Sequence, residues 1–70
     1  MRTLREVREA TGLTEHQLAA MVAVATGTLA AWERGHGRPN TRQVGQLALV
    51  LGVTPDRVLA ALPPPPTGLQ

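Results

Sequence analysis

The sequence predicts an all-α domain built from five short helices. Its 70 residues make one domain, close to the smallest size at which a chain buries enough surface to fold alone. The apolar residues are almost all Leu, Val and Ala, with Trp32 as the one aromatic side chain, whereas sheets usually recruit Tyr, Phe, Ile and Thr. Residues that cap helices also recur along the chain, each followed by apolar residues at helical spacing.

The first two helices each begin with a capping box, in which the capping residue and the residue three positions later cap each other's backbone N–H groups. Thr3 with Glu6 opens the first helix, and Gly12 ends it. Thr14 with Gln17 opens the second helix. The residues expected to face inward are Leu4, Val7 and Ala10 in the first helix, and Leu18, Ala19 and Val22 in the second.

The third helix is expected over residues 26–34, after a short turn at residues 23–24. Gly35 then ends it, since glycine readily adopts the left-handed conformation that closes many helices. Leu29 and Trp32 lie three positions apart and should be buried. The residues expected to look outward are Thr26, Gly27, Ala30, Ala31 and Arg34.

A fourth helix follows the loop at residues 35–40, which contains two Gly and one Pro. Asn40 with Gln43 offers a third cap for this helix, and Gly52 ends it. Its apolar stripe consists of Val44, Leu47, Ala48 and Leu51.

A fifth helix, through about Leu62, begins at Thr54 and Pro55, because proline suits the first helical position after a capping threonine. The four prolines at residues 63–66 cannot continue a helix, so they predict a short polyproline arm or a frayed tail. The chain is therefore expected to divide into a helical domain at residues 1–62 and a proline-rich C-terminal tail at residues 63–70.

The positive charge of the chain is concentrated after the third helix. The net charge is +2, and the chain contains Arg but no Lys. The planar guanidinium of arginine suits phosphates and guanine edges, although codon drift in a G- and C-rich genome would give the same bias. Residues 34–42 carry Arg34, Arg38, Arg42 and His36 with no acidic residue. This segment predicts a cationic patch on a nearly balanced protein.

Three stretches carry a resemblance to a known family: LREVREATGLTEHQLAAMVAV, TLAAWERGHGRP and LALVLGVTPDRVL. With them, the segment from Leu4 to Leu62 resembles the lambda-repressor-like, Cro/Xre-type helix-turn-helix family. The resemblance implies a compact five-helix DNA-binding domain whose helix-turn-helix is formed by the second and third helices. In this family the third helix enters the major groove, while the start of the second helix and the loop after the third contact phosphates.

The resemblance assigns the base-facing positions to small side chains: Ala25, Thr26, Gly27, Thr28 and Ala31. Thr26 or Thr28 can donate to a base or a phosphate, and the methyl groups of Ala25 and Ala31 can meet a thymine methyl. These positions lack the Arg, Gln or Asn that make bidentate base contacts. Thr26 can instead serve as a helix cap, because Ala25 occupies the position that usually holds the capping residue.

The residues expected to contact phosphates are Gln17, Arg34, Arg38 and Arg42. Arg34, at the end of the third helix, can reach a phosphate or a guanine, or its charge simply favours the helix C-terminus. Arg38 and Arg42 are expected to contact phosphates from the loop and from the start of the fourth helix, or else to form a solvated face.

Two positions depart from the family pattern. Many relatives carry a phosphate-binding Gln where this chain has Glu15, whose carboxylate should repel DNA, so Gln17 or His16 is expected to take over the contact. Ala23 stands where the turn usually has Gly with positive φ, which is expected to cost about 1 kcal/mol. The resemblance also implies an internal ion pair between Arg8 and Glu33. The expected role of this pair is to hold the third helix against the first.

The chain lacks the residues that several classes of protein function require. The absence of Cys excludes disulfides and thiolate metal sites. His16 and His36 are far apart with no third ligand at metal spacing, so no metal and no cofactor are expected. The sequence offers no catalytic residue set, so no enzyme activity is expected. No apolar run is long enough to cross a membrane and no signal-peptide pattern is present, so no membrane association and a cytoplasmic location are expected.

The leading hypothesis is sequence-selective binding of double-stranded DNA by a small transcriptional repressor or phage-type regulator that acts as a dimer. The alternative is an antitoxin or adaptor module whose fold mainly binds a protein partner, either a toxin or an adaptor target. The smooth third helix and Glu15 favour this alternative. Val58, Leu59 and Leu62 are the expected homodimer surface, since they exceed what so small a core needs, or else they close the core of the monomer.

Overall fold

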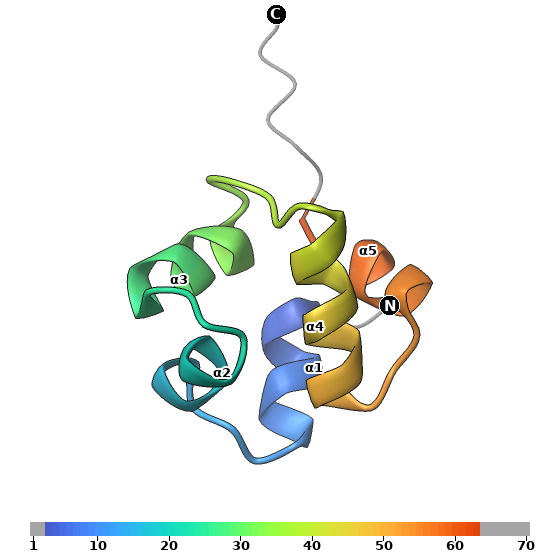
Figure 1. Ribbon diagram of the computed structural model, residues 1–70, viewed down its shortest axis with the longest axis horizontal. Helices are drawn as coiled ribbons and strands as arrows, with labels where there is room; N and C mark the ends of the chain where they lie inside the picture. The colour runs from blue at the N-terminus through green and yellow to red at the C-terminus, as the bar shows by residue number, and fades with distance from the viewer. Residues whose placement is uncertain (1–2, 64–70) are drawn as a thin grey trace, which may run out of the picture.

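The helices begin and end close to where the sequence predicts. The computed structural model describes residues 3–63, and the regular structure in that part of the chain is entirely helical. In chain order the helices are α1 (Leu4–Ala10), α2 (Glu15–Met21), α3 (Thr26–Arg34), α4 (Thr41–Leu51) and α5 (Pro55–Ala61) (Figure 1). The predicted all-α fold is therefore confirmed. Of the predicted proline-rich tail, residues 64–70 lie outside the described residues.

Side-chain caps start every one of these helices except α3. In α2, Thr14 Oγ1 accepts from the Gln17 N–H at 3.0 Å, and Gln17 Oε1 accepts from the Thr14 N–H at 2.9 Å. Each such cap stabilises its helix by about 1 kcal/mol. The capping pairs are Thr3 with Glu6, Thr14 with Gln17, Asn40 with Gln43, and Thr54 with the backbone of Arg57. Before α3, by contrast, Ala25 makes no side-chain capping bond.

The core is a single cluster of aliphatic side chains together with Trp32. α2 packs against α3 and α4 packs against α5, while α1 also contacts α5. Figure 1 shows α1 in the middle of the molecule, with α2 and α3 on one side and α5 on the other. The buried cluster consists of Leu4, Val7, Leu18, Ala19, Val22, Leu29, Trp32, Val44, Leu47, Ala48, Leu51, Val58, Ala61 and Leu62.

Two predictions about which side of a helix faces the core are wrong. Ala10 is exposed, because the buried face of α1 is turned toward Arg8, whose side chain is buried by its contact with another helix. Ala30 is buried and not outward-facing. The buried arc of α3 includes Ala30 and is thus wider than a stripe through Leu29 and Trp32 alone.

Of the two roles left open for the apolar side chains of α5 and its C-cap, a homodimer surface or closure of the monomer core, two of the three side chains have the second. Val58 and Leu62 are 1% and 8% exposed and belong to the core, so they are used to close the monomer. Leu59, in contrast, is 48% exposed. α5 is a helix of seven residues, and successive positions on so short a helix point to different sides, so only part of its apolar surface can face inward.

In residues 3–63, no single helix is long and apolar enough to cross a membrane. α4 and α5 reach the required length and composition only when they are counted together, and the chain bends by 101° between them. The same described residues contain no group of His, Cys, Asp and Glu side chains that could hold a metal ion.

Candidate nucleic-acid interface

A tight turn sets the direction of α3 relative to α2. Ala23, in this turn, has φ 59°, and within residues 3–63 it is the one residue other than glycine with a positive φ. The turn is closed by the N–H of Val24, which donates to the carbonyl of Ala19 at 3.0 Å. The left-handed conformation costs an alanine roughly 1 kcal/mol, so the predicted strain falls at Ala23. The surrounding contacts hold the turn in this conformation, and α3 therefore crosses α2 at a fixed angle.

The outer face of α3 is made of small side chains. Ala25, Gly27 and Thr28 are exposed, and Ala31 is partly buried. A Cβ added at Gly27 would have nothing within 4 Å, so packing inside this chain does not require glycine there. Glycine inside a helix costs roughly 0.5–1 kcal/mol relative to alanine. Because its side chains are small, this face leaves room for another molecule to approach the backbone of α3 closely. The glycine that contributes to this room lowers the stability of the helix.

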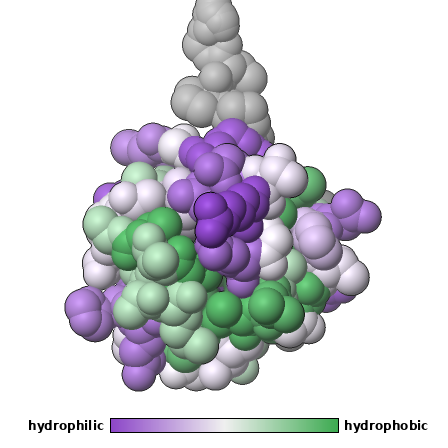
Figure 2. All heavy atoms as spheres, viewed as in Figure 1, coloured by the Kyte–Doolittle hydropathy of each residue, from purple (hydrophilic) through white to green (hydrophobic). Residues whose placement is uncertain are grey.

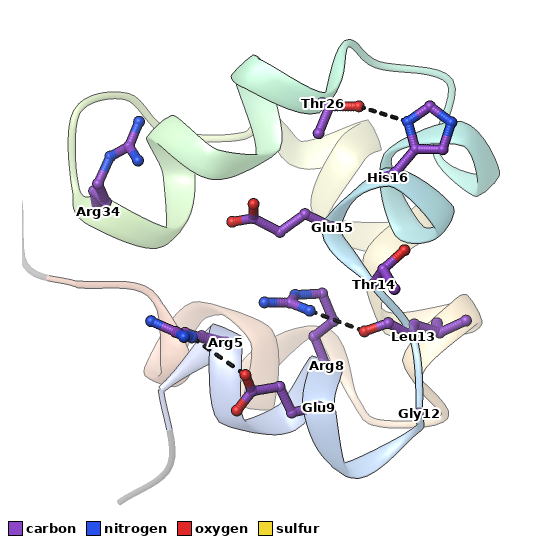
Figure 3. Close-up of a pocket in the computed structure, with 10 residues that line it drawn as sticks. All are labelled: Arg5, Arg8, Glu9, Gly12, Leu13, Thr14, Glu15, His16, Thr26 and Arg34. Atoms are coloured by element: carbon purple, nitrogen blue, oxygen red, sulfur yellow. Dashed lines mark hydrogen bonds and ion pairs between the residues drawn. The ribbon is translucent and has the colours of Figure 1, made fainter.

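Thr26 contacts the preceding helix and does not cap its own. It is the first residue of α3, whereas the capping position belongs to Ala25. The Thr26 hydroxyl lies 3.2 Å from Nδ1 of His16, which is exposed on the first turn of α2 (Figure 3). Of the two roles that the sequence left open for Thr26, capping is thus excluded.

The side chains predicted to contact phosphates border α3 at separate points. Arg34 is exposed at the last position of α3, while Arg42 is exposed on the first turn of α4 and lines a hollow beside the α2–α3 turn. Nη1 of Arg38 donates to the carbonyl of Pro63 at 2.9 Å, which engages one of its five N–H donors. Oε1 of Gln17 caps α2, so its amide nitrogen is the group that can donate outward. The face shown in Figure 2 is most hydrophilic over the start of α4 and hydrophobic over its end.

An open groove of about 770 Å³ lies between α1 and the facing sides of α2 and α3 (Figure 3). Its lining residues are Arg5, Arg8, Glu9, Gly12, Leu13, Thr14, Glu15, His16, Thr26 and Arg34. The structure thus brings two of the residues predicted to contact DNA, Thr26 and Arg34, to the same groove as Arg8 of the predicted ion pair. It also adds Arg5, which sequence reasoning missed because the residue belongs to no motif; its Nε lies 3.3 Å from Oε2 of Glu9.

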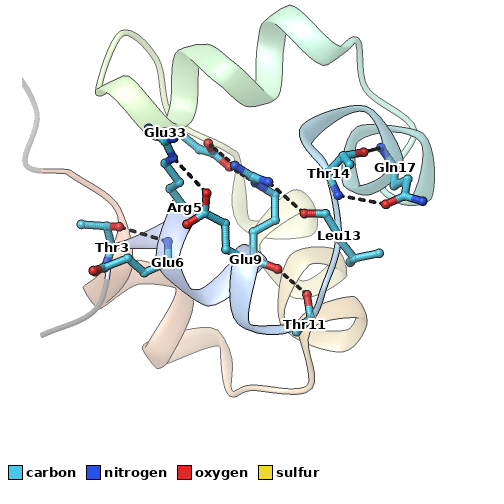
Figure 4. Close-up of polar contacts among 10 residues, drawn as sticks. Thr3, Arg5, Glu6, Glu9, Thr11, Leu13, Thr14, Gln17 and Glu33 are labelled. Atoms are coloured by element: carbon cyan, nitrogen blue, oxygen red, sulfur yellow. Dashed lines mark hydrogen bonds and ion pairs between the residues drawn. The ribbon is translucent and has the colours of Figure 1, made fainter.

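Behind this groove, an ion pair joins α1 to α3 (Figure 4). Nε of Arg8 lies 2.7 Å from Oε2 of Glu33, and Nη2 donates to Oε1 at 3.3 Å. Nη1 of Arg8 donates to the carbonyl of Leu13 at 2.8 Å. The two side chains are only 8% and 4% exposed. Removing either partner would leave a buried charge without its counter-charge, so this pair fixes α3 against α1.

Burial and the neighbouring charged groups shift the pKa of Glu33 in opposite directions. Burial raises the pKa of the Glu33 carboxyl above its ordinary value of 4.5, the hydrogen bond from Arg8 opposes that rise, and the neighbouring Glu15 carboxyl adds to it. The hydrogen bond to Glu33 also raises the pKa of Arg8, so the guanidinium stays charged. Glu15 points into the groove, as Figure 3 shows. It therefore places negative charge on both the ion pair and the surface next to α3.

The comparison with known families agrees with this geometry. A family model described as helix-turn-helix matches residues 4–58, which include the whole of α1 to α4 and the start of α5. The chain therefore belongs to the lambda-repressor-like helix-turn-helix family.

Among solved structures, the chain is similar to the clp gene regulator ClgR from Corynebacterium glutamicum, with a TM-score of 0.75 and 29% sequence identity. The similar region covers 83% of this chain and 62% of the ClgR chain, so this chain spans less than two thirds of that structure. No curated protein was found to match the chain.

Proposed function

We propose that this chain binds double-stranded DNA and regulates transcription, with α3 in the major groove. The observation that carries the proposal is the outer face of α3, which is exposed, made of small side chains and joined to α2 by a tight turn. An α-helix fits the major groove, and a helix with small side chains can bring its backbone close to the base edges. The likeness to a gene regulator of known structure supports the same function.

In this proposal, affinity comes chiefly from phosphates. Arg34, Arg38 and Arg42 contact the DNA backbone from the end of α3, from the loop after it and from the start of α4. Gln17 adds a contact through its amide nitrogen. The bond from Arg38 to Pro63 fixes the loop before DNA arrives, which lowers the entropy lost when the loop binds. Such phosphate contacts set register and orientation on the duplex without reading its sequence.

Sequence selectivity in this proposal comes from small groups. The methyl groups of Ala25 and Ala31 contact thymine methyls, and the hydroxyls of Thr26 and Thr28 bond to base edges or to the nearest phosphate. Because Gly27 has no side chain, the backbone in the middle of the outer face of α3 lies directly against the major groove of the DNA. Because few donors and acceptors are present, DNA shape and the spacing of half-sites supply the remaining selectivity.

We further propose that the protein acts as a homodimer and as a repressor. Leu59 is 48% exposed and lines an apolar groove of about 350 Å³ between α4 and α5, together with Pro39, Thr41, Val44, Gly45 and Pro55. Exposed leucines beside an apolar groove favour burial against a second copy, and a twofold dimer would then read two half-sites. We assign the chain no enzymatic role, because the family model and the likeness to a gene regulator support a DNA-binding regulator.

A second candidate function is that of an antitoxin or adaptor module that binds a protein partner. It is favoured by three exposed apolar side chains: Met21, Leu49 and Leu59 are 57%, 84% and 48% exposed. The carboxylate of Glu15 beside α3 favours it as well, because this charge opposes DNA.

Selection from a pool of duplexes with about 25 randomised base pairs, followed by salt titration of the enriched sequence, distinguishes these functions. About three phosphate-binding arginines per subunit in a dimer predict a slope of log K against log salt near −5. A palindromic motif with half-sites about one helical turn apart is the second expected result. Enrichment of no motif, with weak binding alone, would contradict the proposal and favour a protein partner.

A further inference from the structure

The contact between His16 and Thr26 joins the two helices of the helix-turn-helix at the surface. His16 lies on the first turn of α2, and Thr26 is the first residue of α3. Nδ1 of the imidazole and Oγ1 of the hydroxyl are 3.2 Å apart. His16 is exposed and Thr26 is partly buried, so the pair is open to solvent on the side where α3 begins. A ligand that touches Thr26 therefore meets a hydroxyl that is already hydrogen-bonded.

The direction of this hydrogen bond decides what else the hydroxyl can do. A threonine hydroxyl has one hydrogen to donate and two lone pairs to accept with. When Nδ1 carries no proton, the Thr26 hydroxyl donates to it, and only its lone pairs remain for a base. It can then accept from adenine N6 or cytosine N4. When Nδ1 is protonated, it donates to Thr26, whose hydrogen becomes available to guanine O6, guanine N7 or thymine O4.

We propose that His16 is a positioning residue for base recognition, that its neutral imidazole carries its proton on Nε2, and that protonation of Nδ1 then switches Thr26 from accepting to donating toward a base. This inference rests on the proposed function, since it requires α3 to lie in the major groove. It assigns to Thr26 a base preference that changes as the solution is acidified. Imidazole is the side chain whose charge ordinarily changes between about pH 5 and pH 8, so a comparison of acidic with mildly basic solution tests the assignment.

The imidazole shares its groove with charged groups of both signs. These groups are Arg5, Arg8 and Glu9 on α1, the adjacent Glu15 on α2, and Arg34 on α3. Protonation of His16 also adds a positive charge beside the DNA backbone, which strengthens binding to every sequence alike. Base preference and total affinity must therefore be measured separately.

The test is a selection from the duplex pool with about 25 randomised base pairs, run at about pH 5.5 and about pH 8. Four duplexes that differ only at the base pair most sensitive to Thr26 are then compared by competition at both pH values. At the base that Thr26 contacts, guanine and thymine present only acceptors and cytosine presents only a donor. We expect the ratio of affinities for these two kinds of duplex to change by at least about threefold between the two pH values, the effect of one modest hydrogen bond. Higher affinity for all four duplexes at acidic pH is expected besides.

Three variants and a control separate this mechanism from a structural role. His16→Gln cannot titrate, so its base preference should be the same at both pH values. Thr26→Val should have no preference at this position, and Thr26→Ser should keep the switch. His36→Gln is the matched control, because it removes an exposed histidine from the loop after α3 and should leave the switch intact. The melting temperature of each variant establishes that it is folded.

The outcomes distinguish this inference from the proposed function. A motif that is enriched at both pH values with an unchanged base preference would overturn the role of His16 while leaving DNA binding in place. A preference that changes with pH equally in His16→Gln would do the same. The absence of any motif at either pH would contradict the proposed function itself.

Discussion

α3 and α4 end alike but begin differently. Both close on a left-handed glycine, Gly35 with φ 81° and Gly52 with φ 71°. α4 begins with a complete capping box at Asn40, whereas α3 begins at Ala25 without a side-chain cap and follows the strained Ala23. Local interactions therefore support α4 at both ends and α3 at only one.

The difference shows where the stability of α3 comes from. This helix is held by tertiary contacts: Leu29 and Trp32 are buried in the core, and Glu33 is paired with Arg8. Departures from the local rules of helix formation tend to concentrate where a chain meets its ligand, since function there takes precedence over stability. In this molecule three departures, the strained turn, the missing cap and Gly27, all fall at the start of α3.

The largest expected effect is on stability, from the buried ion pair. Glu33→Ala leaves the Arg8 guanidinium buried without a counter-charge and should lower the free energy of unfolding by about 3–5 kcal/mol. Urea denaturation measures this directly. Glu9→Ala is the control, because its pair with Arg5 is exposed and should contribute less than about 1 kcal/mol. Equal losses in the two variants would mean that α3 does not depend on this tertiary contact.

The next effect is on DNA binding. Arg34→Ala should weaken binding to the selected duplex at least about tenfold, which corresponds to about 1.4 kcal/mol, while the melting temperature changes little because the side chain is exposed. Arg57→Ala removes an exposed arginine from α5 and should leave the affinity nearly unchanged. A large loss of stability with unchanged affinity would show that Arg34 serves the fold.

Removing the cap of α4, or supplying a cap to α3, should make the stabilities of the two helices more alike. Asn40→Ala removes the cap of α4 and is expected to cost about 1 kcal/mol, whereas Ala25→Ser supplies the missing cap of α3 and is expected to gain about the same amount. Thermal unfolding of both variants measures the two shifts. If Ala25→Ser gave no stabilisation, other contacts would hold the start of α3. The missing cap would then not distinguish the stability of α3 from that of α4.

Glu15→Gln tests the electrostatics of the groove and should have the smallest effect on stability. Glu33 has a raised pKa in the folded protein, so its contribution to stability is largest at acidic pH and is lost as the pH rises through that pKa. Removing the Glu15 charge should lower the pKa of Glu33, which stabilises the protein at neutral pH and changes little below about pH 4. Carboxyl titration by NMR and unfolding at several pH values measure both effects.

The same substitution should tighten DNA binding, since it removes a negative charge from the surface beside α3. An affinity gain of a few-fold is expected at low salt, and it should fall as salt screens the repulsion. Glu9→Gln, which changes the charge on the α1 side of the groove, should give a smaller gain. An unchanged affinity for Glu15→Gln would place Glu15 away from the DNA.

The sequence predicts the local features of this fold well. The capping residues of four helices and the apolar stripe of α4 were found from short-range patterns, because caps and helical spacing involve residues only three or four positions apart. The strained turn at Ala23 followed from the family resemblance and was confirmed.

Contacts between distant residues were not predictable in the same way. Ala10 and Ala30 were placed on the wrong faces, because the rotation of a helix depends on what packs around it. The bond from Arg38 to Pro63 joins residues far apart in the chain and has no sequence pattern. The contact of His16 with Thr26 likewise depends on the angle between α2 and α3.

In the proposed function, α3 gives up stability so that its backbone can approach DNA. Gly27 and Gly45 test it as a pair, since each lies within a helix, is exposed, and has nothing within 4 Å of an added Cβ. Both Gly27→Ala and Gly45→Ala should stabilise the fold by up to about 1 kcal/mol. Sedimentation of Gly45→Ala checks that its oligomeric state is unchanged, because Gly45 lines the apolar groove.

The most direct measurement is the affinity of these two variants for the selected duplex. Gly27→Ala, although more stable, should bind about tenfold more weakly, which corresponds to about 1.4 kcal/mol, because a methyl group separates the helix from the groove. Gly45→Ala should bind like the original chain. If Gly27→Ala were both more stable and equally tight in binding, the outer face of α3 would not be the surface that meets DNA.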